Sequence, residues 1–476
     1  MKRNKHISSI FSLCFSLIFP SAYLKAQSKV DLDSLSSAKH VYPPLRYDED
    51  WSYLKDASFR TEGLDKFKFI PLNKSKAAFI TLGGESRLRF EYYHNENLGA
   101  SPHTDNGYFQ QRSFLHADIH LSEHFRVFTQ LNSSTTSFRQ GGPRPIFDKD
   151  VLDVNQAFFD ISFGDKKKNF TLRSGRQELH YGNGKLVEPR EGPNQRLAFD
   201  AIRMIVKTKA VNIETFLAQP VINKQSTFDN TGDSNTTFWG IYSSLAPMKG
   251  FGLDVYYFGI KNKLALFEKG SGEEDRHTFG FKFNGRYKKL DYETENFFQT
   301  GTFANYSIAA WGSTVNFSYR LPAQLLKSTI GIGASISSGD DGTASNRLGT
   351  FNALFPTGFY FGPPALPIGP ANLKVVRVSL TSVLLKNLLF MPSWGVFWRQ
   401  NANDGIYTPA STLYRAGNSA NADYIGNQLN MTLLLKINPH ITFMTSYATF
   451  TSGDFIKETG PNKNVSYINT DLTFKF

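Results

Sequence analysis

The chain has 476 residues, a formal net charge of +12 and a single cysteine. Aromatic residues make up 14% of it, led by 43 Phe and 21 Tyr, although the mean hydropathy is only −0.33. A helical membrane protein is excluded because no stretch reaches the roughly 18 uninterrupted apolar residues of a spanning helix, and one cysteine excludes a disulfide framework.

The first 26 residues are typical of a secretory signal peptide. Three basic residues within the first five positions precede an apolar core from 7 to 19, and Ala26-Gln27 offers a cleavage point. A retained membrane helix is the alternative, but the run is short and broken by serines and a proline. Cys14 lies inside the core, not at its end, so we expect no lipidation. Cleavage would remove the cysteine and leave a net charge near +8.

Residues 27–77 are polar and mixed, with prolines at 43, 44 and 71. We interpret them as a periplasmic lead-in segment that is partly helical or packed in the lumen of the β-barrel predicted below.

From Phe79 onward, short alternating stretches follow one another, separated by Gly, Asn, Asp and Pro. The clearest runs from Ile80 to Tyr92, with leucine and aromatic residues on one face. The opposite face carries four charges: Glu85, Arg87, Arg89 and Glu91. Such a face would be costly in a dry core. It is tolerated in a β-barrel, where the charges meet water or each other and the apolar face meets lipid.

The same design recurs along the rest of the chain. The further predicted strands are 112–121, 125–132, 150–163, 169–178, 200–210, 211–220, 236–246, 251–261, 276–287, 289–300, 304–319, 327–338, 374–385, 389–400, 424–437, 440–451 and 464–476. The total is about 18, an even number in the range of bacterial porins. We therefore predict an all-β fold, a single transmembrane antiparallel β-barrel over residues 78–476 with no second domain.

Five long connections are rich in Gly, Pro, Asn and Asp and cannot be strands: 132–150, 179–200, 222–236, 339–373 and 401–423. In a barrel of this size, we expect them to lie outside the membrane or to fold partly into the lumen and set its width.

The last ten residues, Tyr467 to Phe476, alternate to the end of the chain, with polar residues on one face and mostly apolar residues on the other. This pattern suits a strand that closes a barrel. The terminal Phe also resembles the C-terminal signal of bacterial outer-membrane proteins. We therefore expect the chain in the bacterial outer membrane.

The stretch GRQELHYGNGKLVEPREGPNQRLAFDAIRM (175–204) departs from the hairpin pattern. Its glycines allow tight folding, and its alternating charges can lock to one another. It resembles the signature of the bacterial alginate-export family of outer-membrane barrels. Further matching stretches are FNALFPTGFYFG (351–362), IGPANL (368–373), WGVFWRQNANDGIY (394–407) and Tyr424-Ile425-Gly426. Together they span most of the chain after residue 80.

The resemblance implies a monomeric porin whose lumen arginines attract a polyuronate. Arginine binds carboxylates with two hydrogen bonds and keeps its charge, and conduction requires weak, repeated sites. The arginines predicted to line the substrate path are Arg87, Arg89, Arg112, Arg173, Arg176, Arg190, Arg196, Arg203 and Arg399. The acids predicted to position them are Glu85, Glu178, Glu191 and Asp200. The permeant would be an acidic saccharide or another organic anion, which also suits the positive net charge.

Other interpretations stay open. Any single arginine can be a structural strut, since wide barrels pair Arg with Glu along their walls. His116 and His120 share a strand face and could serve a hydrolase, although a wet lumen wall explains them as well. A barrel plugged by residues 27–77 or 179–200, or an uptake porin for another small anion, is a further alternative. We expect no enzyme activity, cofactor, metal or nucleic-acid partner, and no periplasmic partner is identified.

Overall fold

The structure is a computed structural model that describes residues 42–165, 168–248, 250–322, 327–342, 345–358, 360–361, 365–417 and 420–476. The predicted signal peptide, residues 1–26, lies outside the described residues, as does the start of the lead-in segment.

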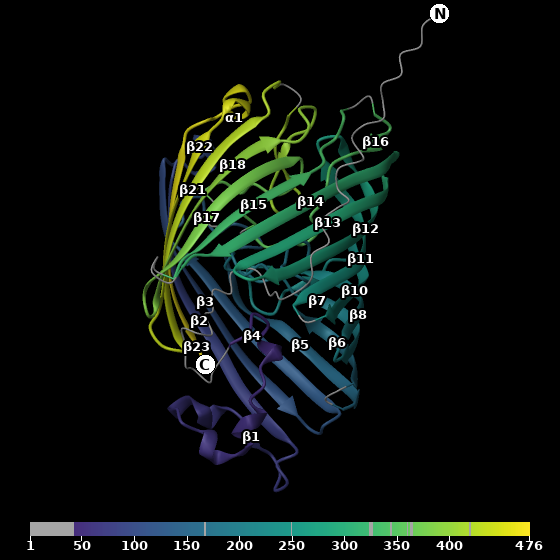
Figure 1. Ribbon diagram of the computed structural model, residues 1–476, viewed down its shortest axis with the longest axis vertical. Helices are drawn as coiled ribbons and strands as arrows, with labels where there is room; N and C mark the ends of the chain where they lie inside the picture. The colour runs from purple at the N-terminus through teal and green to yellow at the C-terminus, as the bar shows by residue number, and fades with distance from the viewer. Residues whose placement is uncertain are drawn as a thin grey trace, which may run out of the picture.

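Eighteen antiparallel strands form one closed barrel, as the alternation predicts (Figure 1). The strands are β2 (Phe79–His94), β3 (Asp105–His120), β4 (Phe125–Ser137), β5 (Asp150–Gly164), β6 (Lys168–Gln177), β7 (Phe199–Thr208), β8 (Val211–Ile222), β10 (Thr236–Met248), β11 (Phe251–Phe267), β12 (Gly270–Tyr287), β13 (Leu290–Phe303), β14 (Tyr306–Arg320), β15 (Thr329–Ser337), β17 (Leu373–Leu385), β18 (Leu388–Arg399), β21 (Tyr424–Lys436), β22 (Ile441–Ser452) and β23 (Val465–Lys475). The predicted strand at the C-terminus closes the ring by pairing with β2, from Glu85 with Lys475 to His94 with Ser466.

The remaining elements are short. Two-residue strands extend the sheet at β1 (Ile70–Pro71), β9 (Thr231–Gly232) and β16 (Arg347–Leu348), and β19 (Ile406–Tyr407) pairs with β20 (Leu413–Arg415). The helices are η1 (Arg46–Asp48), η2 (Ser52–Lys55), η3 (Ala57–Phe59), η4 (Gly63–Phe67), η5 (Glu96–Gly99) and α1 (Asp454–Glu458). None of the helices in the described ranges has the length and apolarity needed to cross a membrane.

The two ends of the barrel differ. One end, which we name the turn end, has mostly short connections, such as 121–124, 209–210 and 288–289. The long connections lie at the other, the loop end, and include 178–198 and 338–372. The helices η1 to η4 and the C-terminus lie at the turn end (Figure 1).

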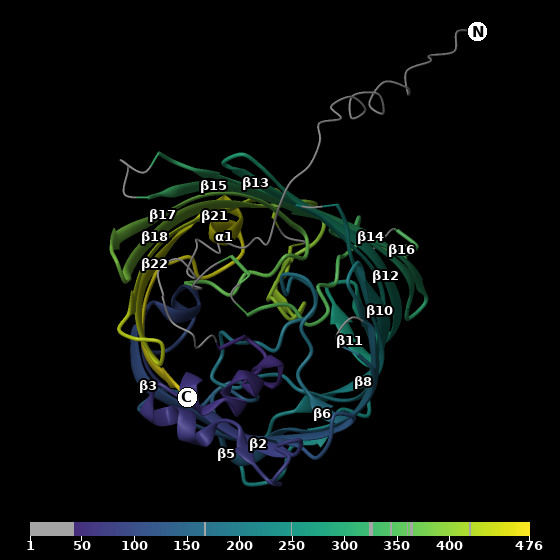
Figure 2. The ribbon, with the colours of Figure 1, turned by 60° about the horizontal axis from the view of Figure 1, so that its bottom comes forward.

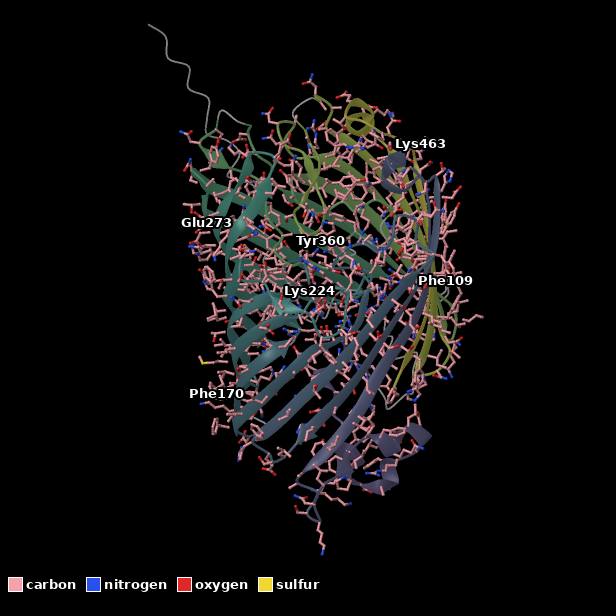
Figure 3. The ribbon with its side chains drawn as sticks, turned by 180° about the vertical axis from the view of Figure 1, so that it is seen from behind. Phe109, Phe170, Lys224, Glu273, Tyr360 and Lys463 are labelled. Carbon is pink, nitrogen blue, oxygen red and sulfur yellow. The ribbon has the colours of Figure 1, made fainter. Side chains whose placement is uncertain are left out.

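The outer wall is apolar, as the alternation predicts. Its most exposed large side chains include Leu88, Phe109, Leu115, Ile202, Leu217, Phe298 and Ile332, all more than half exposed. Phe109 and Phe170 stand at the silhouette of the barrel (Figure 3). The predicted inward charges on β2, by contrast, are each only 4% exposed. Lipid therefore meets hydrocarbon outside, while the charges lie within.

The lumen is occupied by chain. Segments from both ends run across the interior of the ring (Figure 2). Four side chains of the 178–198 connection pack against Phe216, Phe238 and Phe258 on the inner wall: Leu179, Leu186, Val187 and Leu197. The prediction that long loops fold partly into the lumen is therefore confirmed for this connection.

Candidate permeation path

The connection between β6 and β7, residues 178–198, crosses the lumen, and we name it the crossing loop. Its apolar residues contact the wall of β8, β10 and β11, as described above. Glu191 of this loop meets the opposite wall, formed by β2 and β3, where Arg87 and Arg112 bind it. The amphipathic sequence of the loop thus fixes it at both walls.

A tight turn brings the crossing loop close to the wall. Gly182 and Gly184 have φ of +59° and +72°, a conformation that glycine adopts without a steric penalty. A Cβ on Gly182 would lie only 2.9 Å from the Tyr242 hydroxyl. Asn183, between the two glycines, donates a hydrogen bond to Glu293 on β13.

The crossing loop is also joined to the 338–372 connection by backbone hydrogen bonds. The Phe355 amide donates to the Leu186 carbonyl and the Glu188 amide donates to the Phe355 carbonyl, both at 2.9 Å. The Thr357 amide donates to the Gly184 carbonyl, also at 2.9 Å. The two predicted family stretches, far apart in sequence, therefore form one unit inside the barrel.

Glu191 is the polar centre of the crossing loop. Its carboxylate accepts from Arg112 at 2.5 Å and from Arg196 at 2.9 Å. Arg87 donates to the Glu191 carbonyl at 3.1 Å, and Arg112 also binds Glu85 at 2.6 Å. Burial opposes ionisation, but the neighbouring arginines hold the pKa of Glu191 at about 2.

Glu178 begins the crossing loop and pairs with Arg196 at 2.8 Å. Its carboxylate also accepts from Asn155 at 2.8 Å. The group is fully enclosed, and burial raises the pKa of Glu178 to about 7 even though Arg196 acts against the shift. Its charge therefore changes near neutral pH.

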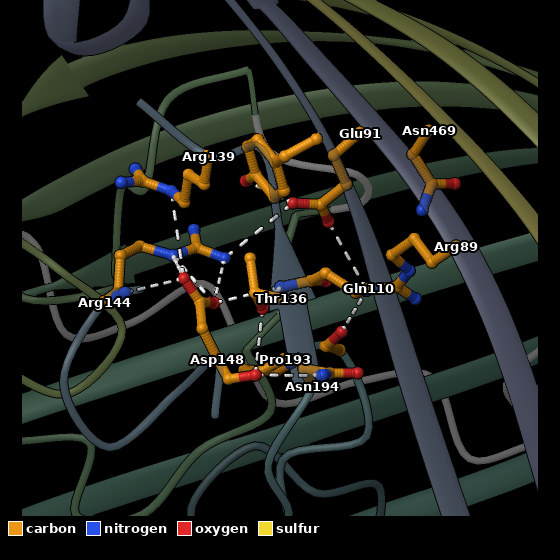
Figure 4. Close-up of polar contacts among 12 residues, drawn as sticks. Arg89, Glu91, Gln110, Thr136, Arg139, Arg144, Asp148, Pro193, Asn194 and Asn469 are labelled. Atoms are coloured by element: carbon orange, nitrogen blue, oxygen red, sulfur yellow. Dashed lines mark hydrogen bonds and ion pairs between the residues drawn. The ribbon is translucent and has the colours of Figure 1, made fainter. Parts of the chain in front are cut away.

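A second network ties the crossing loop to the 138–149 connection (Figure 4). Asp148 accepts from Arg144 at 2.7 Å and from Gln110, on β3, at 3.0 Å. The Asn194 side chain of the crossing loop donates to the Asp148 carbonyl at 3.0 Å. These residues were not predicted, because short-range alternation does not reveal which loop an inward polar residue meets.

The N-terminal segment enters the lumen from the turn end. Tyr47, only 4% exposed, packs edge-on against Phe128 and Phe158 and donates to the Glu178 carbonyl at 2.9 Å. The preceding Arg46 donates to the carbonyls of Gly84 and Phe476 at 2.9 and 2.8 Å. This segment was predicted as a lead-in, but its side-chain anchors were not foreseen.

Cavities lie on either side of this segment. One, of about 680 Å³, lies between the crossing loop, the N-terminal segment and the wall from β8 to β13. Its lining includes Leu45, His180, Asn183, Tyr242, Lys282 and Glu293. A smaller one, of about 230 Å³, is lined by Arg126, Arg173 and Lys207. Asp48 lines both.

Most of the predicted arginines are held by partners in the protein. Arg89 binds Asp471 at 2.5 Å across the closing seam and donates to the Gly192 carbonyl at 2.6 Å. Arg173 makes two hydrogen bonds with Asp160, at 2.7 and 2.8 Å. Both guanidinium groups are thus placed by carboxylates on neighbouring strands.

Two further pairs follow the same pattern. Arg176 makes two hydrogen bonds with Asp200, at 2.8 and 3.1 Å, as the predicted pairing of arginines with acids implies. Arg203 is paired with Glu214 and also donates to Gln177 at 3.2 Å.

Arg399 lies in a different environment. It is fully buried near the loop end, and its guanidinium lies 4.2 Å from the Phe455 ring centroid. Among the described residues it donates to backbone carbonyls alone, those of Ala402, Asp404, Gly417, Ala420 and Ala422. These contacts tie the 400–423 connection together, which is a structural role.

The interior contains cations that form no ion pair with a described residue, among them Lys185, Arg190 and Arg377. Arg190, on the crossing loop, lies 5.8 Å from the Phe147 ring, and burial lowers its pKa to about 10. Lys185, on the same loop, lies over Tyr360. Arg377 is on β17, between two outward valines. Of these, Arg190 was predicted to line the path. The available signal for Arg377 was a basic residue flanked by valines on both sides in β17.

The described residues contain no group of three or more His, Cys, Asp or Glu side chains that could hold a metal. His116 faces the lumen, is 2% exposed and stacks on Phe128 at 5.3 Å. His120, on the same strand, lies 3.2 Å from Asp118 and stacks on Phe79. Both histidines therefore pack against aromatic rings of the barrel wall.

Comparisons with known proteins agree with this geometry. A family model described as alginate export matches residues 79–469. No curated protein sequence matches the chain. Similar solved structures include Pseudomonas aeruginosa OpdO, with 12% identity, a TM-score of 0.55 and coverage of 83% of this chain and 97% of that one. They also include P. aeruginosa OccD3 (10%, 0.57, 83% and 91%) and Acinetobacter baumannii OccAB2 (10%, 0.56, 83% and 98%). At these identities the likeness shows the fold alone. The family match covers most of the barrel, and the chain belongs to the alginate-export family of outer-membrane β-barrel porins.

Proposed function

We propose that this porin gives passive, anion-preferring passage to an acidic saccharide or a similar organic anion. The observation that carries the proposal is the set of unpaired cations on and facing the crossing loop, Lys185, Arg190 and Arg377. A cation that forms no ion pair leaves part of its field for a passing anion, although Glu188 acts on Arg190 and Glu293 and Glu295 act on Lys185. The barrel would act as a monomer and need no cofactor, since a graded field is sufficient for conduction.

The paired arginines have a different role in this proposal. Around Glu191, three arginines (Arg87, Arg112 and Arg196) face three acids (Glu85, Glu178 and Glu191), so their charges nearly cancel. They hold the crossing loop in place and keep its free cations at fixed positions. Of the predicted path, Arg190 would contact the permeant, and Arg87, Arg89, Arg112, Arg173, Arg176, Arg196 and Arg203 would form the frame around it.

We propose that residues 1–26 are a signal peptide and that 27–77 form a periplasmic lead-in to the barrel over 78–476.

A second candidate function, a barrel with a closed lumen, is favoured by the N-terminal segment. Tyr47 reaches the crossing loop from the turn end, so the segment restricts the same lumen. Passage would then require the segment to move.

Planar-bilayer recording of the purified protein tests the proposal. With a KCl gradient across the membrane, the reversal potential of an anion-preferring channel has the same sign as the chloride equilibrium potential. A reversal potential with the sign of the potassium equilibrium potential would overturn the anion preference. Absence of conductance from folded protein would instead favour the closed barrel.

A further inference from the structure

We propose that the turn end of the barrel binds the phosphate headgroups of anionic phospholipids in the periplasmic leaflet. The binding surface, which we name the basic rim, consists of four neighbouring hairpins and the strand ends beside them. Its cations are Arg286, Lys288, Lys289, Arg320, Lys327, Lys386 and Lys436. The inference goes beyond the proposed function, because it concerns the lipid around the barrel and not the permeant.

The basic rim is continuous because its hairpins are neighbours in the ring. It comprises the segments 286–291, 318–329, 383–389 and 434–440, which join β12 to β13, β14 to β15, β17 to β18 and β21 to β22. These strands stand side by side in the wall (Figure 1). Successive hairpins lie about 10 Å apart, because neighbouring strands are about 4.8 Å apart. A phosphate between two turns is therefore within reach of lysines from both.

Hydrogen bonds join the hairpins at the basic rim. The Arg320 amide donates to the Lys289 carbonyl at 3.0 Å, which connects the first hairpin to the second. The ladder of β15 and β17 joins the second hairpin to the third. The Lys436 amide then donates to the Asn387 carbonyl at 2.9 Å, and the Asn387 side chain donates to the Lys436 carbonyl at 3.1 Å. The spacing of the cations is therefore set by the sheet.

Most of the positive charge of the basic rim is not cancelled by acids. In sequence, its four segments contain seven lysines and arginines but a single acid, Asp291. Asp291 pairs with Arg286 and, at 2.9 Å, with Arg320. Lys288 and Lys386, by contrast, are exposed and form no ion pair with a described residue. The edge of the barrel therefore attracts anions from the membrane surface.

The cations border the apolar outer wall. Tyr287, Tyr319, Leu385 and Ile437 each adjoin a basic residue in sequence and are at least 45% exposed. The Nζ of Lys288 lies 5.4 Å from the Tyr287 ring centroid. Tyrosine is typical of the boundary between hydrocarbon and headgroups, and lysine can lay its stem on an apolar wall while its ammonium reaches the phosphates. The basic rim thus lies at the depth of the headgroups.

These features match an anionic phospholipid better than a soluble anion. The phosphate would bind the ammonium groups, and the acyl chains would lie along the aromatic and aliphatic side chains beside them. Short turns of outer-membrane barrels lie on the periplasmic side, so the lipid belongs to that leaflet. Phosphatidylglycerol carries a net negative charge, whereas the amine of phosphatidylcholine cancels that of its phosphate. Each lysine near an anionic membrane surface contributes about five-fold in affinity.

Native mass spectrometry of the purified barrel in a neutral detergent, titrated with phosphatidylglycerol or phosphatidylcholine, tests the site. We expect an apparent dissociation constant at least ten-fold lower for phosphatidylglycerol than for phosphatidylcholine. The double variant Lys288→Gln with Lys386→Gln should raise the phosphatidylglycerol constant at least ten-fold. The matched control, Lys457→Gln with Lys463→Gln, removes two exposed lysines at the loop end and should leave the constant unchanged (Figure 3).

Equal constants for the two lipids would overturn the site, as would an unchanged constant in the double variant or an equal loss in the control. Soluble glycerol phosphate is added as a competitor, and we expect no displacement at concentrations that saturate with lipid. Displacement at equal concentration would mean that the basic rim binds phosphate without lipid, which also contradicts the proposal. Folding of each variant is checked by the heat-dependent mobility of the barrel in detergent gels.

Discussion

The guanidinium of Arg196 donates a hydrogen bond of 3.0 Å to the backbone carbonyl of Pro44. Arg196 belongs to the crossing loop, which starts and ends at the loop end, and Pro44 belongs to the segment that enters from the turn end. The same arginine pairs with Glu178 and Glu191. The state of the N-terminal segment is thus linked physically to the loop that carries the unpaired cations.

Loosening the N-terminal segment should increase conductance. Tyr47→Ala removes the ring that packs on Phe128 and Phe158 and the hydrogen bond to the Glu178 carbonyl, and should weaken docking by about 3 kcal/mol. Tyr47→Phe keeps the ring and should have a smaller effect. Single-channel conductance in planar bilayers measures both. Equal conductance in parent and Tyr47→Ala would contradict a segment that restricts the lumen.

Anion preference should fall as the pH rises from 6 to 8. Because burial raises the pKa of Glu178 to about 7, its carboxyl is mostly neutral at pH 6 and mostly charged at pH 8. The added negative charge beside Arg196 weakens the attraction for anions. Glu178→Gln should abolish this part of the pH dependence and keep the preference seen at low pH. Reversal potentials at the two pH values provide the measurement. An anion preference that rises with pH would contradict this prediction.

Removing the central acid should have the opposite effect from removing a free cation. Glu191→Gln takes away a negative charge between Arg112 and Arg196 and should raise the anion preference while increasing open-channel noise, since the loop loses its anchor. Glu273→Gln is the matched control, because Glu273 forms an exposed surface pair with Lys261. A Glu191→Gln channel with the selectivity and noise of the control would mean that the ion cluster does not hold the loop.

The orientation of the strands can be tested on the outer wall. Leu88, mid-strand on β2 and 52% exposed, should face the hydrocarbon, so Leu88→Arg should lower the free energy of unfolding in lipid vesicles by about 2–4 kcal/mol. Leu121, next to a turn and 50% exposed, lies near the rim, and Leu121→Arg should cost only about 0–1 kcal/mol. Equal losses in urea titrations of the two variants would contradict this placement.

The strands were predictable because alternation is a local property of the sequence. The stretch from Ile80 to Tyr92, for example, lies within β2, and its four charges face inward as predicted. The closing strand was predictable for the same reason. In a barrel, the alternation within each strand decides which side chains face the lipid and which face the lumen. This assignment requires little knowledge of long-range contacts.

The partners of the inward residues could not be predicted in the same way. Arg89 meets Asp471 because β2 and β23 are neighbours in the closed ring, and the sequence does not give their register. Arg399 looks like the other arginines in sequence, yet its hydrogen bonds to described residues all go to loop carbonyls. Arg377 was missed because an absent acid partner becomes visible only once the facing strands are placed.

The central claim is that unpaired cations at the crossing loop make the lumen prefer anions, and the reversal potential of Arg190→Ala tests it most directly. A unit charge about 5 Å from a passing ion in a water-filled lumen is worth about 0.8 kcal/mol, so chloride permeability should fall and potassium permeability should rise, each by up to about four-fold, and their ratio should fall accordingly. Arg347→Ala, which removes an exposed arginine paired with Asp341, should leave the ratio unchanged. A ratio in Arg190→Ala equal to that of the parent would contradict the account.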